Sequence, residues 1–183
     1  EAGDPLPTHV LSDLRLTEIM YNPPESDPGR GELPVENNSF EFIELCNIGS
    51  TTLDLTGVSF EDGIAFRFGG SRIESLPSGG FLLVVQNEAA FVSRYGAALT
   101  GLIAGQYDGK LANDGETLRL VDSWNGTIVK FGYSDDWFPS TDGDGFSLTV
   151  ADPQRDPGAW GEPASWRPSA TVGGSPGRDE NGN

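Results

Sequence analysis

The feature that most constrains this chain is a series of short apolar segments, separated by Gly, Asn, Asp and Pro turns, across residues 14–150. Apolar runs of about four to eight residues bounded by such turns are typical of β-strands. The 25 glycines and 13 prolines of the chain argue against long helices. The pattern predicts an all-β domain over residues 14–150, with a lead-in segment at residues 1–13 and a Pro/Gly-rich tail or linker at residues 151–183.

The length and composition fit a single domain with its own hydrophobic core. A chain of 183 residues with 36% hydrophobic and 10% aromatic residues can bury a core without disulfides. No apolar run approaches the roughly 18 residues of a membrane-spanning helix, so we expect no membrane insertion. The chain starts at Glu1 without a signal-like segment, and we expect a processed chain or a part of a larger multidomain protein, with any targeting signal missing from this sequence.

The net charge narrows the classes of partner, and the single cysteine bears on the redox compartment. With 28 acidic and 11 basic residues the net charge is −17, which repels phosphate backbones and makes nucleic acid an unfavourable partner. Cys46 has no second cysteine with which to pair, and this fits either a reducing compartment or a bacterial secreted domain. In an apolar strand, Cys46 is expected to be buried as a small hydrophobe.

Local patterns place the individual elements. Strands are predicted at residues 14–21, 40–47, 116–122 and 127–132, a central strand at 81–85, and a last core strand at 146–150. Asp62-Gly63 and Asn125-Gly126 predict tight hairpins. Asn87 predicts the cap of one short helix at residues 88–95, which ends at Gly96. Residues 22–38 hold four prolines among charged residues and predict a long loop, a candidate contact surface.

Two glutamates, Glu18 and Glu44, fall on the apolar register of their strands. Partial cover on both faces of the sheet, or a β-bulge near Glu18, would explain the position of Glu18. Alternatively, Glu18 directs its carboxylate at a loop or an ion, because buried charges need partners.

The catalytic inventory of the sequence is thin. His9 is the only histidine, and Cys46 has no basic neighbour, so neither a Ser-His pair, a multi-His metal site nor a cysteine nucleophile is supported. The paired glycines at 69–70 and 79–80 lack the spacing of a phosphate-binding loop.

An acidic cluster is the remaining candidate site. Asp135, Asp136, Asp142 and Asp144 lie within ten residues on glycine-rich backbone, an oxygen-rich setting that calcium favours, and Glu18 is a possible further ligand. The spacing does not satisfy an EF-hand. The competing interpretation is that these aspartates are solvated turn formers beside glycines with positive φ. A glycosidase acid–base pair would need a cleft that the sequence does not indicate.

A family resemblance rests on motifs that cover most of the chain. They are Glu18-Ile19-Met20-Tyr21-Asn22-Pro23, Phe42-Ile43-Glu44-Leu45 with Asn47, Leu53-Asp54-Leu55-Thr56-Gly57, Leu76-Pro77, residues 111–122, and residues 137–148 with Asp142-Gly143-Asp144-Gly145. In order and spacing they resemble bacterial lamin tail domains. The resemblance implies an immunoglobulin-like β-sandwich, in a family found in nuclear lamins and in bacterial secreted or surface proteins beside hydrolase, nuclease or kinase domains. The loop before Phe40 and the helix at Asn87 depart from the compact lamin version.

Two function classes follow. The favoured one is a noncatalytic accessory or interaction module of a bacterial secreted or cell-surface protein, which contacts protein or cell-envelope polysaccharide. The alternative is a carbohydrate-binding module, with Ca²⁺ as a candidate stabilising ion and with sugars stacked on exposed Trp124, Trp137, Trp160 or Trp166. For Trp160 and Trp166 in the tail, burial against the sandwich competes with exposure as a stacking platform. No heptad rod supports a filament role.

Overall fold

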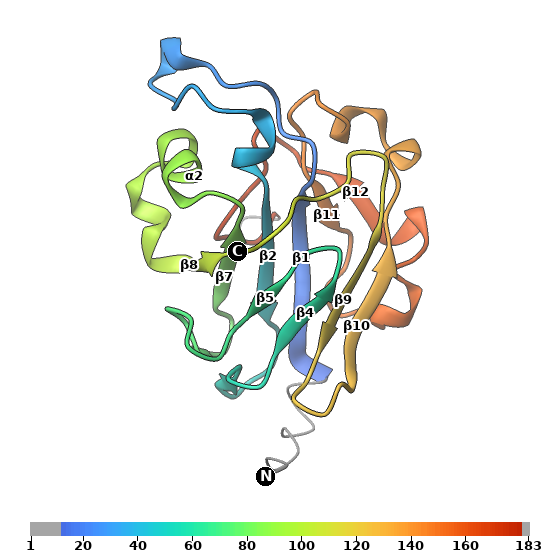
Figure 1. Ribbon diagram of the computed structural model, residues 1–183. Coiled ribbons are helices and arrows are strands. Elements are labelled where there is room, and N and C mark those ends of the chain that lie inside the picture. Colours follow the sequence, from blue (N-terminus) through green and yellow to red (C-terminus); the bar gives the residue numbers. More distant parts are fainter. Residues whose placement is uncertain (1–11, 181–183) are drawn as a thin grey trace.

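The computed structural model describes residues 12–180 and shows two β-sheets packed face to face, with one short α-helix at the side (Figure 1). His9 and the rest of the lead-in up to residue 11 lie outside the described residues. The larger sheet has six strands, in the order β12 (Trp166–Pro168), β11 (Leu148–Val150), β1 (Leu14–Met20), β2 (Phe42–Asn47), β7 (Phe81–Val85) and β8 (Ile103–Gln106). The smaller sheet has four strands, in the order β10 (Thr127–Gly132), β9 (Thr117–Val121), β4 (Ser59–Asp62) and β5 (Phe66–Arg67). The immunoglobulin-like sandwich predicted from the sequence is confirmed.

Shorter elements fill the connections. β3 (Leu53–Asp54) and β6 (Ser75–Leu76) pair as a separate two-stranded ribbon. The α-helix is α2 (Glu88–Tyr95). The 3₁₀ turns are η1 (Pro28–Arg30), η2 (Asn37–Phe40), η3 (Ala97–Leu102), η4 (Asp135–Trp137), η5 (Pro139–Thr141), η6 (Pro157–Ala159) and η7 (Pro163–Ser165). No helix within residues 12–180 is both long and apolar enough to span a bilayer.

The core lies between the two sheets and follows the alternation of the strands. On β1, Leu14, Leu16 and Ile19 join the buried cluster, although a strict period of two would exclude Ile19. The register shifts between Leu16 and Glu18, so Thr17 is the extra residue of a β-bulge. The bulge predicted near Glu18 is therefore confirmed, and it turns Glu18 to the outer face of the six-stranded sheet.

The helix covers one part of that outer face. β7 is buried on both sides, because Leu82 and Val84 face the other sheet while Leu83 and Val85 pack under Phe91 of α2. β7 and β8 run parallel, and a parallel pair needs a crossover, which α2 and η3 supply. The predicted helix is confirmed to its bounds, as is its cap.

The long loop at residues 22–38 is fixed to this helix. Arg94 donates to both carboxylate oxygens of Glu32 at 2.9 and 2.8 Å, and its guanidinium lies 3.5 Å from the centre of the Phe40 ring. The backbone N–H of Leu33 donates to the Ser93 hydroxyl. The loop and the helix thus pack on each other as one unit.

The prediction of a poorly core-forming tail is wrong. β12 pairs antiparallel with β11 and completes the six-stranded sheet, so residues 146–150 are not the last core strand. Trp160 and Trp166 belong to the main buried cluster and contact the ring of Phe131 at centroid distances of 5.9 and 4.9 Å. Two indoles supply the apolar area that the surrounding Pro, Gly and Ser residues lack.

Candidate functional site

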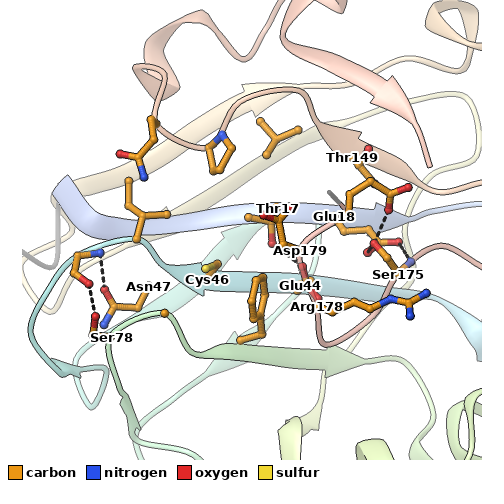
Figure 2. Close-up of a pocket in the computed structure, with 18 residues that line it drawn as sticks. Thr17, Glu18, Glu44, Cys46, Asn47, Ser78, Thr149, Ser175, Arg178 and Asp179 are labelled. Atoms are coloured by element: carbon orange, nitrogen blue, oxygen red, sulfur yellow. Dashed lines mark hydrogen bonds between the residues drawn. The ribbon is translucent and has the colours of Figure 1, made fainter. Parts of the chain in front are cut away.

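A polar groove on the outer face of the six-stranded sheet holds the two glutamates that the sequence singled out. The bulge at Thr17 and the antiparallel register place Glu18 of β1 opposite Glu44 of β2. Both glutamates are only 1% exposed. Residues 174–180, which we call the C-terminal strap, lie over them (Figure 2).

Glu18 is held by hydroxyl and amide donors. Its Oε1 accepts from the Ser147 hydroxyl at 2.5 Å and from the backbone N–H of Ser175 at 2.9 Å. Its Oε2 lies 3.1 Å from the Ser175 hydroxyl. Glu18 therefore directs its carboxyl at a loop, the second alternative considered from the sequence, and that loop is the strap.

Glu44 makes the matching contact two residues further along the strap, at Gly177. Its Oε2 accepts from the backbone N–H of Gly177 at 2.6 Å, and its Oε1 accepts from the Thr17 hydroxyl at 2.7 Å. Burial raises the pKa of Glu44 well above its usual range, and the neighbouring Glu18 carboxyl raises it further. Burial also raises the pKa of Glu18, to about 7, against the opposing effect of its hydrogen bonds.

The open part of the groove extends from the strap across β2 and β7, with a volume of about 350 Å³. Cys46 and the half-buried Phe81 line its floor, and Asn47 and Ser78 lie at its far end (Figure 2). Burial raises the pKa of the Cys46 thiol to about 12, so this cysteine stays protonated and is a poor nucleophile. The groove can accept hydrogen-bond donors, but its carboxyls are already occupied by the strap.

A third buried glutamate, Glu41, escaped the sequence analysis. Its Oε2 accepts from the Tyr107 hydroxyl at 2.7 Å and from the backbone N–H of Leu111 at 2.8 Å, while its Oε1 has no partner. Burial raises the pKa of Glu41 to about 7. Its position directly before β2, in line with Phe40 and Phe42, was the only available signal. Glu41 connects the segment after β8 to the start of β2.

The predicted acidic cluster does not converge. Asp142 accepts from the Asn22 side-chain amide, Asp135 accepts from the N–H of Asp136 in the turn that Ser134 caps, and Asp136 and Asp144 are exposed. Glu18 lies in the groove under the strap. Residues 12–180 contain no group of three or more His, Cys, Asp or Glu side chains placed to hold a metal ion. The prediction of a shared calcium site is wrong, and the turn-former interpretation fits, with Gly143 and Gly145 at φ of 89° and 93°.

The four tryptophans separate into buried and exposed. Trp160 and Trp166 are 0% and 3% exposed, so neither can stack on a sugar, and the burial alternative holds for both. Trp137 is half-buried against the core. Trp124 is 50% exposed, and it alone among the four remains a candidate binding residue.

Trp124 lies in a rigid turn between β9 and β10, residues 122–126, which we call the hairpin tip. Asp122 Oδ1 accepts from the N–H groups of Trp124 and Gly126, at 2.9 and 2.7 Å. Arg119 donates to the carbonyl and side-chain oxygens of Asn125, which adopts a φ of 63°. The turn is thus fixed by its own hydrogen bonds and leaves the indole free.

A shallow depression of about 560 Å³ adjoins the hairpin tip. Its wall is mostly polar and comes from the ends of β4, β5 and β9, including Glu61, Arg67 and Asn125. A rigid exposed aromatic beside a polar rim is the arrangement found at protein–protein contacts.

Comparison with known proteins gives one match. The family model described as Lamin Tail Domain matches residues 7–135, more than half of the chain. No curated protein and no solved structure matches the chain. The family match ends before β11, so β11, β12, the buried tryptophan pair and the strap lie beyond it.

Proposed function

Since the chain belongs to the lamin tail domain family, an immunoglobulin-like family of interaction modules, we propose that it is a noncatalytic module of a bacterial secreted or cell-surface protein. It contacts a protein partner through the hairpin tip. The bacterial setting is supported by the motifs shared with bacterial members of the family. The acidic surface and the occupied carboxyls of the groove support binding over chemistry.

The exposed Trp124 on its fixed turn carries the proposal. Binding hot spots are enriched in tryptophan, and a residue held rigid before binding loses little conformational freedom. The indole is 50% exposed although hydrogen bonds from Asp122 and Arg119 fix the turn that carries it. Its apolar surface is therefore left in contact with water, which is unfavourable. A partner that covers the indole removes this apolar surface from water and gains the corresponding free energy.

Carbohydrate binding has less support. A stacking platform for a polysaccharide needs two or more solvent-facing rings, and within residues 12–180 Trp124 is the only exposed tryptophan. The alternative becomes an outcome of the experiment.

The test measures binding of the purified, labelled domain to cell envelopes of the source bacterium, before and after protease treatment, and to purified peptidoglycan, cellulose and chitin. We expect binding that protease treatment abolishes. Trp124→Ala should weaken it by at least about 30-fold, the loss of one hot spot. Val172→Ala is the matched control, because Val172 is apolar and 63% exposed but lies against Gly145, outside the hairpin tip.

Three results would overturn the proposal. They are binding to a purified polysaccharide that survives protease, equal binding by the Trp124→Ala variant, and no binding to any of the probes. A melting midpoint of the variant within about 2 °C of the parent ensures that the fold is intact, since surface changes of this kind shift stability by no more than about 0.5 kcal/mol.

A further inference from the structure

The C-terminal strap rests on the sheet through two buried carboxyls. Ser175 and Gly177 donate their backbone N–H groups to Glu18 and Glu44, and these two glutamates lie opposite each other on neighbouring strands. None of the salt bridges within residues 12–180 includes either glutamate. Two adjacent carboxyls without a paired cation cannot both ionise in a buried site without strong repulsion.

Proton counting in the strap also requires a protonated carboxyl beside the pair, on Glu18 or on Glu180. The Ser175 hydroxyl lies within hydrogen-bond reach of Glu18 Oε2 and also of Glu180 Oε2. A serine hydroxyl has one proton and can donate to only one of them. Both contacts are hydrogen bonds only when one carboxyl carries a proton and donates it to Ser175.

We propose that the C-terminal strap is a proton-controlled cover, which lies on the sheet while the Glu18–Glu44 pair retains a proton and lifts when both carboxyls ionise. Lifting the strap extends the open groove over Glu18 and Glu44, which are only 1% exposed beneath it. The sheet under the strap is then an additional surface that the protein exposes at neutral to alkaline pH and covers in acid.

The groups around the pair favour this direction of control. The titratable groups on the strap are Arg178, Asp179 and Glu180. Those on the elements beneath and beside it are Cys46 of β2 and Tyr95 of α2. Glu180 raises the pKa of Glu18, and the single cation, Arg178, is exposed. A group whose pKa is raised by folding stabilises the closed form below its ordinary pKa, and that stabilisation is lost as pH rises through about 7, the pKa of Glu18.

Amide hydrogen exchange of the full chain, read by NMR, tests the cover directly. We expect the protection factors of the Ser175 and Gly177 amides to fall at least tenfold between about pH 5.5 and about pH 8.5. The Gly126 amide is the internal control, because it also donates to a carboxylate, that of Asp122, and should keep its protection. The double variant Glu18→Gln/Glu44→Gln mimics the protonated pair and should keep the strap protected across the range.

A variant with the opposite expected effect on the strap is available at Gly174. This residue has a φ of +76°, and a Cβ added to it would lie 2.0 Å from Glu18 Oε1. Gly174→Ala should release the strap at every pH. Unchanged wild-type protection across the range would overturn the proposal, and so would an equal loss in the glutamine variant. If the glutamine variant fails to fold, the ¹³C shifts of the Glu18 and Glu44 carboxyls in the wild-type protein provide the test. The proposal is overturned if both carboxyls are ionised while the Ser175 and Gly177 amides stay protected. The strap and the hairpin tip are separate surfaces, so this experiment and the Trp124 experiment fail independently.

Discussion

At the scale of single residues, three buried glutamates hold together segments that lie far apart in the sequence. Glu18, Glu41 and Glu44 each accept at least one backbone N–H from a segment distant in the sequence. A buried carboxyl is costly unless it is hydrogen-bonded, so each of these residues fixes the segment that supplies its donor.

Trp160 gives a residue-scale test of the corrected tail. It is 0% exposed and packs edge-to-face on Phe131 and Trp166. Trp160→Ala should lower the free energy of unfolding by about 3 to 5 kcal/mol, because a large cavity replaces the indole. Chemical denaturation measures the loss. Trp124→Ala is the matched control and should change stability by less than about 0.5 kcal/mol; equal effects of the two variants would contradict the burial of Trp160.

At the scale of elements, the segment after residue 150 is structural. β12 pairs with β11, Trp166 donates its indole N–H to the carbonyl of Trp160 at 2.7 Å, and the strap closes the outer face. The division into a sandwich at 14–150 and a tail at 151–183 therefore does not match the packing.

A truncation at residue 150 tests this element. Removing residues 151–183 leaves Phe131 and Val150 without the two indoles that cover them. We expect the shortened chain to lack a cooperative thermal transition, because it loses two large core side chains and an edge strand together. Removal of residues 181–183 alone is the control and should leave the transition unchanged. A cooperative melt of the 150-residue chain near that of the parent would show that the tail is dispensable.

The loop at residues 22–38 and α2 form the second element that can be tested. Arg94 joins them through a bidentate ion pair in which the Arg94 and Glu32 side chains are 9% and 12% exposed. Arg94→Ala should cost about 3 kcal/mol and leave Glu32 without its partner. Limited proteolysis should then cut within residues 22–38 faster than in the parent. Arg72→Ala is the control, since its ion pair with Glu88 is exposed to solvent and should contribute little to stability.

At the scale of the whole molecule, the charge and the buried glutamates act in the same direction. Burial raises the pKa values of Glu18 and Glu41 to about 7, and it raises that of Glu44 well above its usual range. A folded pKa above the unfolded value stabilises the fold below about 4.5 and loses that effect as pH rises through about 7. The net charge of −17 adds repulsion over the same range.

We therefore expect the free energy of unfolding to fall from about pH 5 to about pH 8, by on the order of 1 kcal/mol per pH unit for each buried glutamate. Urea denaturation at a series of pH values measures this slope. Glu41→Gln should flatten it without affecting the strap, because Glu41 lies at the opposite end of β2 from the Asn47 turn and contacts Tyr107 and Leu111 instead. A stability that rises over this range would contradict the prediction. The hydrogen bonds that lower the pKa values of Glu32 and Asp54 act in the opposite sense, and only at more acidic pH.

The sequence by itself determined the features that depend on neighbouring residues. The helix with its Asn87 cap, the Asn125-Gly126 hairpin and the central strand at 81–85 follow from backbone preferences and apolar runs within a few positions. The family resemblance rested on motifs of the same local kind, and the family match confirms it.

Only the tertiary structure decided which distant residues meet. Glu18 is 157 residues from Ser175, and no local pattern encodes that contact. The four aspartates, although close in sequence, do not converge on one site, while two tryptophans in a polar segment fold back into the core. Spacing along the chain predicts proximity only within one element; between elements, strand register and the burial of apolar area decide it.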